Sequence, residues 1–191
     1  FPESIDLCFI CTPIKSIVET VKQVSDHLNS NVVITDIGSV KRSIDTISLH
    51  KESHTFIPGH PMAGSDQQGI QFAHANILRN APYVLIENQT SQFSKLKQFL
   101  NALGFNVVVT TAHKHDEIVG LVSHLPYLMS CLTVDSAQAL SNGDKTLVKQ
   151  LAGPGFRDTS RVANSSPEWG VNVCLENKDT LVTGIKHLRS E

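Results

Sequence analysis

Two short apolar runs, separated by the pattern of an amphipathic helix, constrain the fold of this chain more than any other feature of its sequence. The runs cover residues 5–10 and 32–35, and neither shows the polar alternation of a half-exposed strand. Between them, residues 14–28 repeat apolar side chains at the spacing of a helix with one buried stripe. A buried strand, a helix and a second buried strand in succession predict a parallel sheet with helices on both faces.

The alternation of strands and helices continues to residue 109 and then stops. The expected elements are a helix at 39–49, a strand at 55–57, a loop at 58–69, a strand at 83–86, a helix at 91–103 and a strand at 107–109. They predict that residues 1–112 form part of a Rossmann-type α/β domain, an architecture that binds ligands at the carboxyl ends of its strands.

From His113 onward the sequence has only the period of helices. Apolar residues recur at helical spacing over about 25 residues, and Pro126 inside this stretch predicts a kink, because proline lacks a backbone N–H. Residues 113–191 are therefore predicted to form an all-helical domain. Such a small domain usually covers its apolar faces with a second subunit, so we expect a homodimer. Shorter helices are expected at 145–151, 166–177 and 178–188.

Charge and hydropathy narrow the classes of partner. The formal net charge is −2 and the basic residues are scattered, so the sequence predicts no nucleic-acid partner. The uninterrupted apolar runs are much shorter than the ~20 residues of a membrane helix, which predicts no membrane span.

The cysteines are too few and too widely spaced for a secreted disulfide framework, which predicts a cytoplasmic protein. Cys8 and Cys11 have the spacing of a redox or metal motif, but no second pair of ligands follows. We therefore expect buried core thiols and no metal site. The other two cysteines are Cys131 and Cys174.

Two polar clusters follow predicted strands in the first half of the chain. In residues 36–41, Gly38 allows a tight turn, and Ser39 is either the N-cap of the next helix or a group that contacts substrate. In residues 59–64, His60 lies between a glycine and a proline. A histidine on so restricted a backbone is a candidate general base near neutral pH.

Two further clusters lie in the helical half. Residues 123–126 place His124 beside the proline, where freed backbone groups could line a cavity; a satisfied structural histidine is the alternative. Residues 155–161 join a Gly-Pro-Gly turn to Arg157 and Arg161. Arginine offers a planar fork for a carboxylate. We expect Arg161 to face a ligand and Arg157 to be structural, paired with the neighbouring aspartate.

Six short motifs, in this order and spacing, resemble the prephenate/arogenate dehydrogenase family, and most of all its short cyanobacterial-type members. The resemblance covers nearly the whole chain. The motifs are Cys11-Thr12-Pro13, residues 36–41, Gly59-His60-Pro61-Met62-Ala63-Gly64, Asn80-Ala81-Pro82-Tyr83, Ser123-His124-Leu125-Pro126 and residues 155–161.

The resemblance implies an oxidoreductase of tyrosine biosynthesis, which oxidatively decarboxylates prephenate or arogenate to an aromatic product. It implies that His60 is the base that accepts the substrate's hydroxyl proton and that Ser39 hydrogen-bonds the same hydroxyl. Arg161 would bind a substrate carboxylate, and His124 would line the pocket. Tyr127 stands where many relatives have a second histidine.

The same resemblance implies a nicotinamide cofactor, NADP more than NAD, bound near Thr12, Pro13 and Ser39. The family's G-x-G-x-x-G turn, which binds the pyrophosphate, does not occur in this sequence. We therefore expect a fragment that alone binds the cofactor poorly and is inactive. Two other interpretations stay open: another Rossmann-plus-helical hydroxy-acid dehydrogenase, or a dimeric binding module without a cofactor.

Overall fold

The computed structural model describes residues 5–28, 31–45, 47, 49, 54–65, 67, 69–141 and 143–190. Its internal contacts divide the chain into two compact units, which we describe separately. Unit 1 comprises Phe1–Gly64 and His74–Glu117, and unit 2 comprises Ser65–Ala73 and Ile118–Glu191. The boundary between the units therefore falls inside a helical run, after the change of composition near His113.

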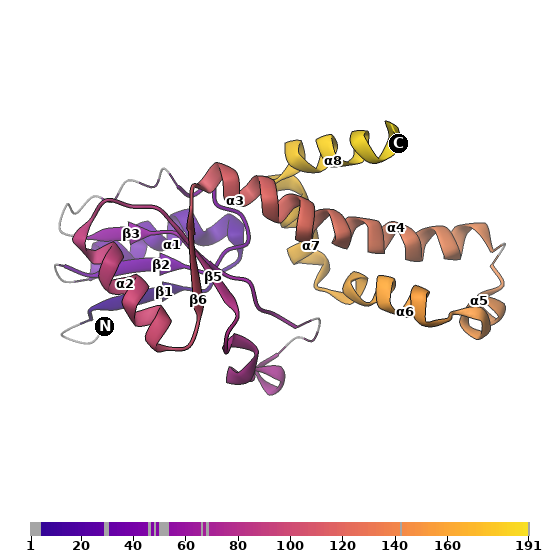
Figure 1. Cartoon of the computed structure of the whole chain (residues 1–191), viewed down its shortest axis with the longest axis horizontal. Helices are drawn as coiled ribbons and strands as arrows, with labels where there is room; N and C mark the ends of the chain where they lie inside the picture. The colour runs from indigo at the N-terminus through magenta and orange to yellow at the C-terminus, as the bar shows by residue number, and fades with distance from the viewer. Residues whose placement is uncertain are drawn as a thin grey trace. The chain divides into compact units, whose positions relative to one another are not determined.

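The described part of unit 1 holds two three-stranded sheets (Figure 1). In the first, β1 (Leu7–Ile10), β2 (Val33–Asp36) and β3 (Thr55–Ile57) are parallel and lie in that order. In the second, β5 (Pro82–Ile86) is parallel to β6 (Asn106–Thr110) and antiparallel to β4 (Gly59–Pro61). The Rossmann-type fold class is confirmed. Residues 59–61, which we expected in a loop, form β4. The glycine and the proline of this strand are typical of loops, so the sequence carries no strand signal here.

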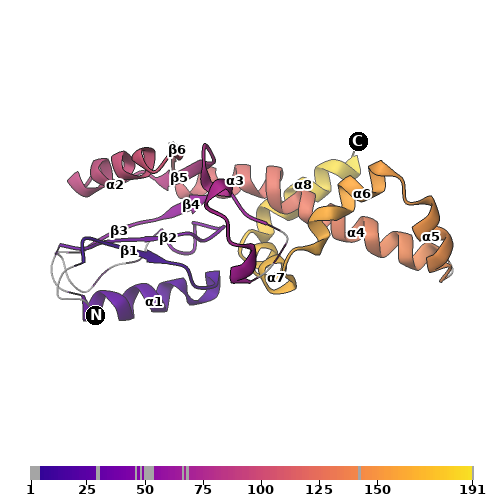
Figure 2. The ribbon, with the colours of Figure 1, turned by 90° about the horizontal axis from the view of Figure 1, so that it is seen from below.

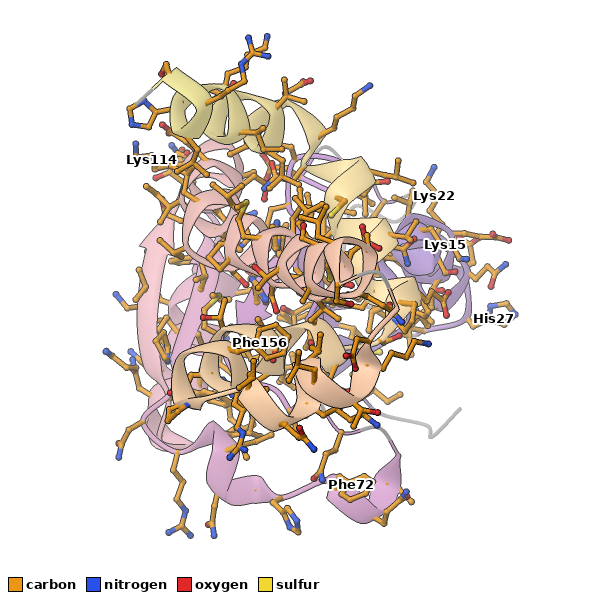
Figure 3. All side chains as sticks on the ribbon, turned by 90° about the vertical axis from the view of Figure 1, so that its right-hand side faces the viewer. Lys15, Lys22, His27, Phe72, Lys114 and Phe156 are labelled. Carbon is orange, nitrogen blue, oxygen red and sulfur yellow. The ribbon has the colours of Figure 1, made fainter. Side chains whose placement is uncertain are left out.

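Two helices cover opposite faces of these strands (Figure 2). α1 (Ile14–His27) packs its buried stripe against one face, and α2 (Ser91–Ala102) packs against the other. Lys15, Lys22 and His27 project from the exposed side of α1 (Figure 3). The apolar contacts of α1 include Ile17, Val21, Ile10 and Ile34, and those of α2 include Leu96, Leu100, Ile57 and Leu85.

The helix predicted at 39–49 is not formed in the described part of that segment. Residues 42–45 form a turn, in which two backbone N–H groups donate to the carbonyl of Lys41. The side chain of Lys41 turns into the core toward Asp36, so this segment does not bury a simple apolar stripe. Positions 46 and 48 lie outside the described residues.

Helices make up the regular structure of the described part of unit 2. After α4 (Leu125–Leu140), α5 (Lys145–Leu151) and α6 (Pro154–Ser160) lead back alongside it (Figure 1). The Gly-Pro-Gly turn expected before Arg157 is instead the first turn of α6, where a proline loses no helical hydrogen bond. The remaining elements are η1 (Ile70–Phe72), η4 (Arg161–Asn164), α7 (Pro167–Glu176) and α8 (Lys178–Ser190), while η2 (Ala75–Leu78) belongs to unit 1.

The disruption predicted around Pro126 takes the form of a π-helical segment. This segment, η3 (Gly120–His124), joins α3 (Ala112–Val119) to α4. Its wider turn ends just before the proline, which occupies the first turn of α4, where no N–H is needed. Gly120 allows close packing here, because a Cβ at this position would lie 2.6 Å from Thr180.

Gly170 in α7 lets the ring of Tyr127 in α4 lie against the helix backbone. A Cβ on Gly170 would lie 2.6 Å from Cε1 of Tyr127 and closer still to the hydroxyl oxygen. Gly170→Ala is therefore expected to lower the free energy of unfolding by about 1–3 kcal/mol, the usual cost of overpacking, although alanine is the better helix former. Urea unfolding measures the change. Gly155→Ala in α6 is the matched control, because an added Cβ there meets nothing within 4 Å; equal stability of the two variants would refute the close contact.

The helical run Ala112–Leu140 is long and apolar for a soluble protein. It has 29 residues, and the mean hydropathy of its most apolar window is 1.4. By length and composition alone this helical run could cross a membrane. The uninterrupted apolar runs of the sequence did not indicate this, because polar residues interrupt the apolar ones along the helix. The core helix of a soluble protein passes the same test, but only 28% of this window is buried within the chain. The absence of a membrane partner thus stays a prediction.

Candidate active site

Asp36, the last residue of β2, forms a buried ion pair with Lys41. Lys41 Nζ lies 2.5 Å from Asp36 Oδ2, and neither side chain is exposed. Burial lowers the pKa of Lys41, although the negative charges of Asp36 and Asp116 act in the opposite direction. A lysine in this environment depends on its partner, because an isolated buried charge is very costly.

The same carboxylate fixes the turn after β2 and the first residue of β4. Asp36 Oδ2 accepts a hydrogen bond from the N–H of Gly38 at 2.7 Å, and Oδ1 accepts one from the N–H of Gly59 at 3.1 Å. The next residue after each glycine is a predicted site residue, Ser39 after β2 and His60 in β4. One buried carboxylate therefore positions the backbone of both.

Asp116 on α3 holds the segment that follows Ser39. It accepts hydrogen bonds from the backbone N–H groups of Lys41 and Arg42, both at 2.8 Å. If Ser39 were an N-cap, its side chain would accept hydrogen bonds from these same N–H groups. Here Asp116 accepts them, so it takes the place that was one alternative for Ser39. Burial opposes the charge of Asp116. The hydrogen bonds from His115, Arg42 and Lys41 outweigh it and lower the pKa of Asp116.

His60 is connected to Asp116 through a second imidazole. The ring of His60 is buried in β4, and its Nδ1 lies 2.9 Å from Nε2 of His115. Nδ1 of His115 lies 2.7 Å from Oδ1 of Asp116. The two rings meet edge-on, with centroids 5.1 Å apart. A histidine held by such a chain has a fixed orientation and can act as a general base.

Sequence reasoning missed His115 and Asp116, although the sequence carries a signal for them. Both are buried on the same face of α3 as Ala112 and Val119. Helical spacing places these four positions on one inward stripe. A histidine and an aspartate inside an apolar stripe need polar partners, and this requirement could have pointed to a site.

Thr12 and Pro13 lie where the sequence predicted them, between the end of β1 and the start of α1. Thr12 is half-buried, and its hydroxyl oxygen lies 3.5 Å from that of Thr20. Ser39 occupies the corresponding place after β2. The carboxyl ends of adjacent parallel strands bind ligands in open α/β sheets, and the binding of a nucleotide by these residues stays a prediction.

His124 and Trp169 form a cluster inside unit 2. His124 is fully buried, and its Nδ1 lies 3.3 Å from Nδ2 of Asn177. The Trp169 ring packs edge-on against His124 and Tyr127. Burial and the hydrogen bond to Cys131 raise the pKa of Tyr127 to about 12. Both alternatives for His124, a structural role and a role in lining a substrate pocket, stay predictions.

Arg157 lies in α6 and Arg161 begins η4, and both are exposed. In the described part of the chain, neither forms an ion pair with Asp158. η4 is fixed to α4 by the hydrogen bond from the N–H of Ala163 to Oγ of Ser130, at 3.0 Å. Arg161 therefore stands on an anchored element, and its carboxylate-binding role stays a prediction.

The cysteines differ in part from the prediction of buried thiols. Cys11 is exposed, because it lies in the turn after β1, while Cys8, Cys131 and Cys174 are half-buried. Burial raises the pKa of Cys11, with a further contribution from the negative charge of Asp36. Among the described residues no group of three or more His, Cys, Asp or Glu side chains could hold a metal ion.

The fold and these positions define a class of protein: a Rossmann-type nucleotide-binding domain followed by a helical domain. Residues 3–109 match the nucleotide-binding domain of prephenate dehydrogenase, and residues 111–191 match the dimerization domain of the same enzyme. The chain belongs to the prephenate dehydrogenase family, as its motifs predicted.

Relatives and solved structures agree with this membership. A prephenate dehydrogenase of Lactococcus lactis is 32% identical to this chain, and the match covers 96% of this chain and 52% of the relative. A cyclohexadienyl dehydrogenase of Zymomonas mobilis is 26% identical, and the match covers 95% of this chain and 64% of the relative. The structure of Synechocystis arogenate dehydrogenase has a TM-score of 0.80 and 34% identity, covering 98% of this chain and 69% of that one. The structure of prephenate dehydrogenase from Aquifex aeolicus, in complex with hydroxyphenyl propionate and NAD+, has a TM-score of 0.86 and 27% identity. The match covers 98% of this chain and 66% of that one. The chain thus spans about half to two thirds of the length of these curated relatives.

Proposed function

We propose that the full-length protein containing this chain oxidatively decarboxylates prephenate or arogenate in tyrosine biosynthesis. The observation that carries this proposal is the connection of His60 through His115 to buried Asp116 at the loop edge of the family's nucleotide-binding domain. The names of the relatives support both substrates, because prephenate, cyclohexadienyl and arogenate dehydrogenases are among them. The cytoplasmic location predicted from the cysteine content is part of the proposal.

In the proposed reaction, His60 accepts the proton of the substrate's carbinol hydroxyl, and Ser39 hydrogen-bonds the same hydroxyl. Arg161 binds a substrate carboxylate, and His124 lines the pocket. A bound nicotinamide supplies the hydride acceptor. Loss of CO2 from the ring carboxylate then leaves an aromatic ring. Because aromatisation drives the reaction, the residues mainly have to orient the substrate and accept one proton.

The cofactor is proposed to contact Thr12, Pro13 and Ser39. Their positions after β1 and β2 support this assignment. NADP is proposed as the preferred cofactor on the resemblance of the motifs to the cyanobacterial-type members of the family. A lower KM for NADP+ than for NAD+ is the expected result, and the opposite order would reverse this preference.

The function is tested by following reduced cofactor after adding prephenate, and separately arogenate, to the full-length protein. At least one of the two substrates should be oxidised, while small hydroxy acids such as lactate should not. Oxidation of a hydroxy acid alone would instead support another Rossmann-plus-helical dehydrogenase. Oxidation of none would favour a binding module.

We further propose that the protein is a homodimer formed through unit 2. α7 exposes Val171 and Leu175, which are 57% and 67% accessible and one helical turn apart, and exposed apolar faces of this kind mark interfaces. The double variant Val171→Glu/Leu175→Glu is expected to shift the protein toward monomer in light scattering after gel filtration. Thr183→Glu in α8 is an exposed control and should stay dimeric. A double variant that remains dimeric would exclude α7 from the interface.

A further inference from the structure

We propose that Asp116 and His115 fix the tautomer of His60, so that Nδ1 of His60 carries the hydrogen and Nε2 is the atom that accepts a proton. His115 and Asp116 are then positioning residues, because they act on the substrate only through His60. The catalytic consequence rests on the proposed function. The tautomer itself does not, since it follows from contacts within unit 1.

The charge of Asp116 decides which atom donates in each hydrogen bond between Asp116, His115 and His60. Its hydrogen bonds lower its pKa, so the side chain is a carboxylate at neutral pH and can only accept. Nδ1 of His115, at 2.7 Å from this carboxylate, must therefore carry a hydrogen. If His115 is neutral, its Nε2 has a lone pair and accepts from Nδ1 of His60 at 2.9 Å. This leaves the lone pair of His60 on Nε2.

The opposite direction requires a protonated His115, and the surrounding charges disfavour it. Asp116 already has a cation beside it, since Arg42 Nε lies 3.4 Å from Oδ2. The backbone N–H groups of Lys41 and Arg42 also donate hydrogen bonds to its carboxylate oxygens. Lys41 is paired with Asp36. A further positive charge on His115, which is 2% exposed, would lose its hydration and would have to share the carboxylate of Asp116 with Arg42.

Among the described residues, neither Asp45 nor Glu87, the other acidic groups near Asp116, forms an ion pair with His115. Asp45 follows the segment that Asp116 holds, and burial raises its pKa, as do the negative charges of Asp116 and Glu87. Protonation of Asp45 is thus favoured relative to an ordinary aspartate. The neutral state of His115, with hydrogen on Nδ1, remains the arrangement that these contacts favour.

The arrangement also stabilises the product of proton transfer. When Nε2 of His60 takes the hydroxyl proton, the ring becomes an imidazolium that still donates from Nδ1 to His115. The positive charge is then held at the end of a hydrogen-bonded chain that leads to Asp116. In metal sites, a partner that orients the imidazole of a ligating histidine and raises its basicity contributes on the order of 10- to 100-fold to affinity or activity, and we expect an effect of the same order here.

Nitrogen NMR of the full-length protein, with 15N-labelled histidine and no substrate, tests the tautomer directly. His60→Gln identifies the His60 signals. We expect wild-type His60 to show a protonated Nδ1 and an unprotonated Nε2 at neutral pH. A His60 ring with hydrogen on Nε2 would overturn the inference, whether or not the protein oxidises prephenate. Failure of the tautomer and failure of the proposed function are therefore distinguishable.

Kinetics of Asp116→Asn test the consequence. We expect kcat to fall on the order of 10- to 100-fold with little change in KM, and the acid limb of the pH profile of kcat/KM to move to lower pH, because the imidazolium loses the carboxylate that stabilises it. A merely structural role would lower kcat without moving this limb, and an unmoved limb would overturn the relay. His113→Gln, an exposed histidine on the same helix, is the control and should leave the profile unchanged.

Discussion

Replacing His60 by asparagine is expected to lower kcat by about 10²- to 10⁴-fold, the usual contribution of a general base, with a much smaller change in KM. Asparagine has a similar size and can still donate toward His115, but it cannot accept the substrate's hydroxyl proton. Because the lost interaction forms as the proton moves, the effect should appear in kcat more than in substrate binding. Steady-state assays of the full-length protein measure both constants.

His74→Asn is the matched control for this experiment. His74 is exposed and directly precedes η2, outside the chain of contacts that ends at Asp116. Its replacement should leave kcat and KM unchanged. If His60→Asn kept more than about a tenth of the wild-type kcat, far above the range for loss of a general base, His60 would not be the base.

Replacing Asp36 by alanine is expected to lower the free energy of unfolding by about 3–5 kcal/mol, the range for removing one partner of a buried ion pair. The variant leaves the ammonium of Lys41 buried without its carboxylate and removes the acceptor of the Gly38 and Gly59 N–H groups. Urea unfolding of the full-length protein measures the loss, provided that one transition is seen.

Two further variants make this result specific. Lys114→Met breaks the exposed pair between Lys114 and Glu117 and should leave the free energy of unfolding nearly unchanged, because solvent screens this pair. Asp36→Asn/Lys41→Met removes both buried charges and should recover much of the loss seen in Asp36→Ala. If Asp36→Ala cost no more than Lys114→Met, the buried pair would not hold the loops as we describe.

Much of the fold could be predicted from the sequence, because most of its elements depend on local periodicity. The strands β1, β2, β3, β5 and β6, the helices α1 and α2, the long helical run that ends with α4, and the helices α5, α7 and α8 were found in this way, while α6 was expected as a turn. The helix expected at 39–49 was wrong for a reason that periodicity cannot show. The segment is held by Asp116, which lies 75 residues from Lys41 in the sequence.

The candidate site was predictable only in part. His60 and Ser39 were predicted because they stand in motifs with unusual backbone restrictions, and the fold places both next to glycines whose N–H groups donate to Asp36, while their roles stay predictions. His115 and Asp116 were missed for two reasons. They come before the motif at residues 123–126, and they contribute through contacts with residues more than 50 positions away in the sequence. Chemistry that depends on tertiary contacts of this kind leaves little trace in local spacing.

Oxidative decarboxylation with His60 as the base is the central claim, and one measurement tests it most directly. Reduced cofactor and released CO2 are quantified together, with the full-length wild-type protein, the His60→Asn variant and a substrate labelled in the ring carboxylate. We predict equal amounts of the two products from the wild type and greatly reduced formation of both by the variant. Reduced cofactor without CO2, or undiminished formation of both by His60→Asn, would contradict the account.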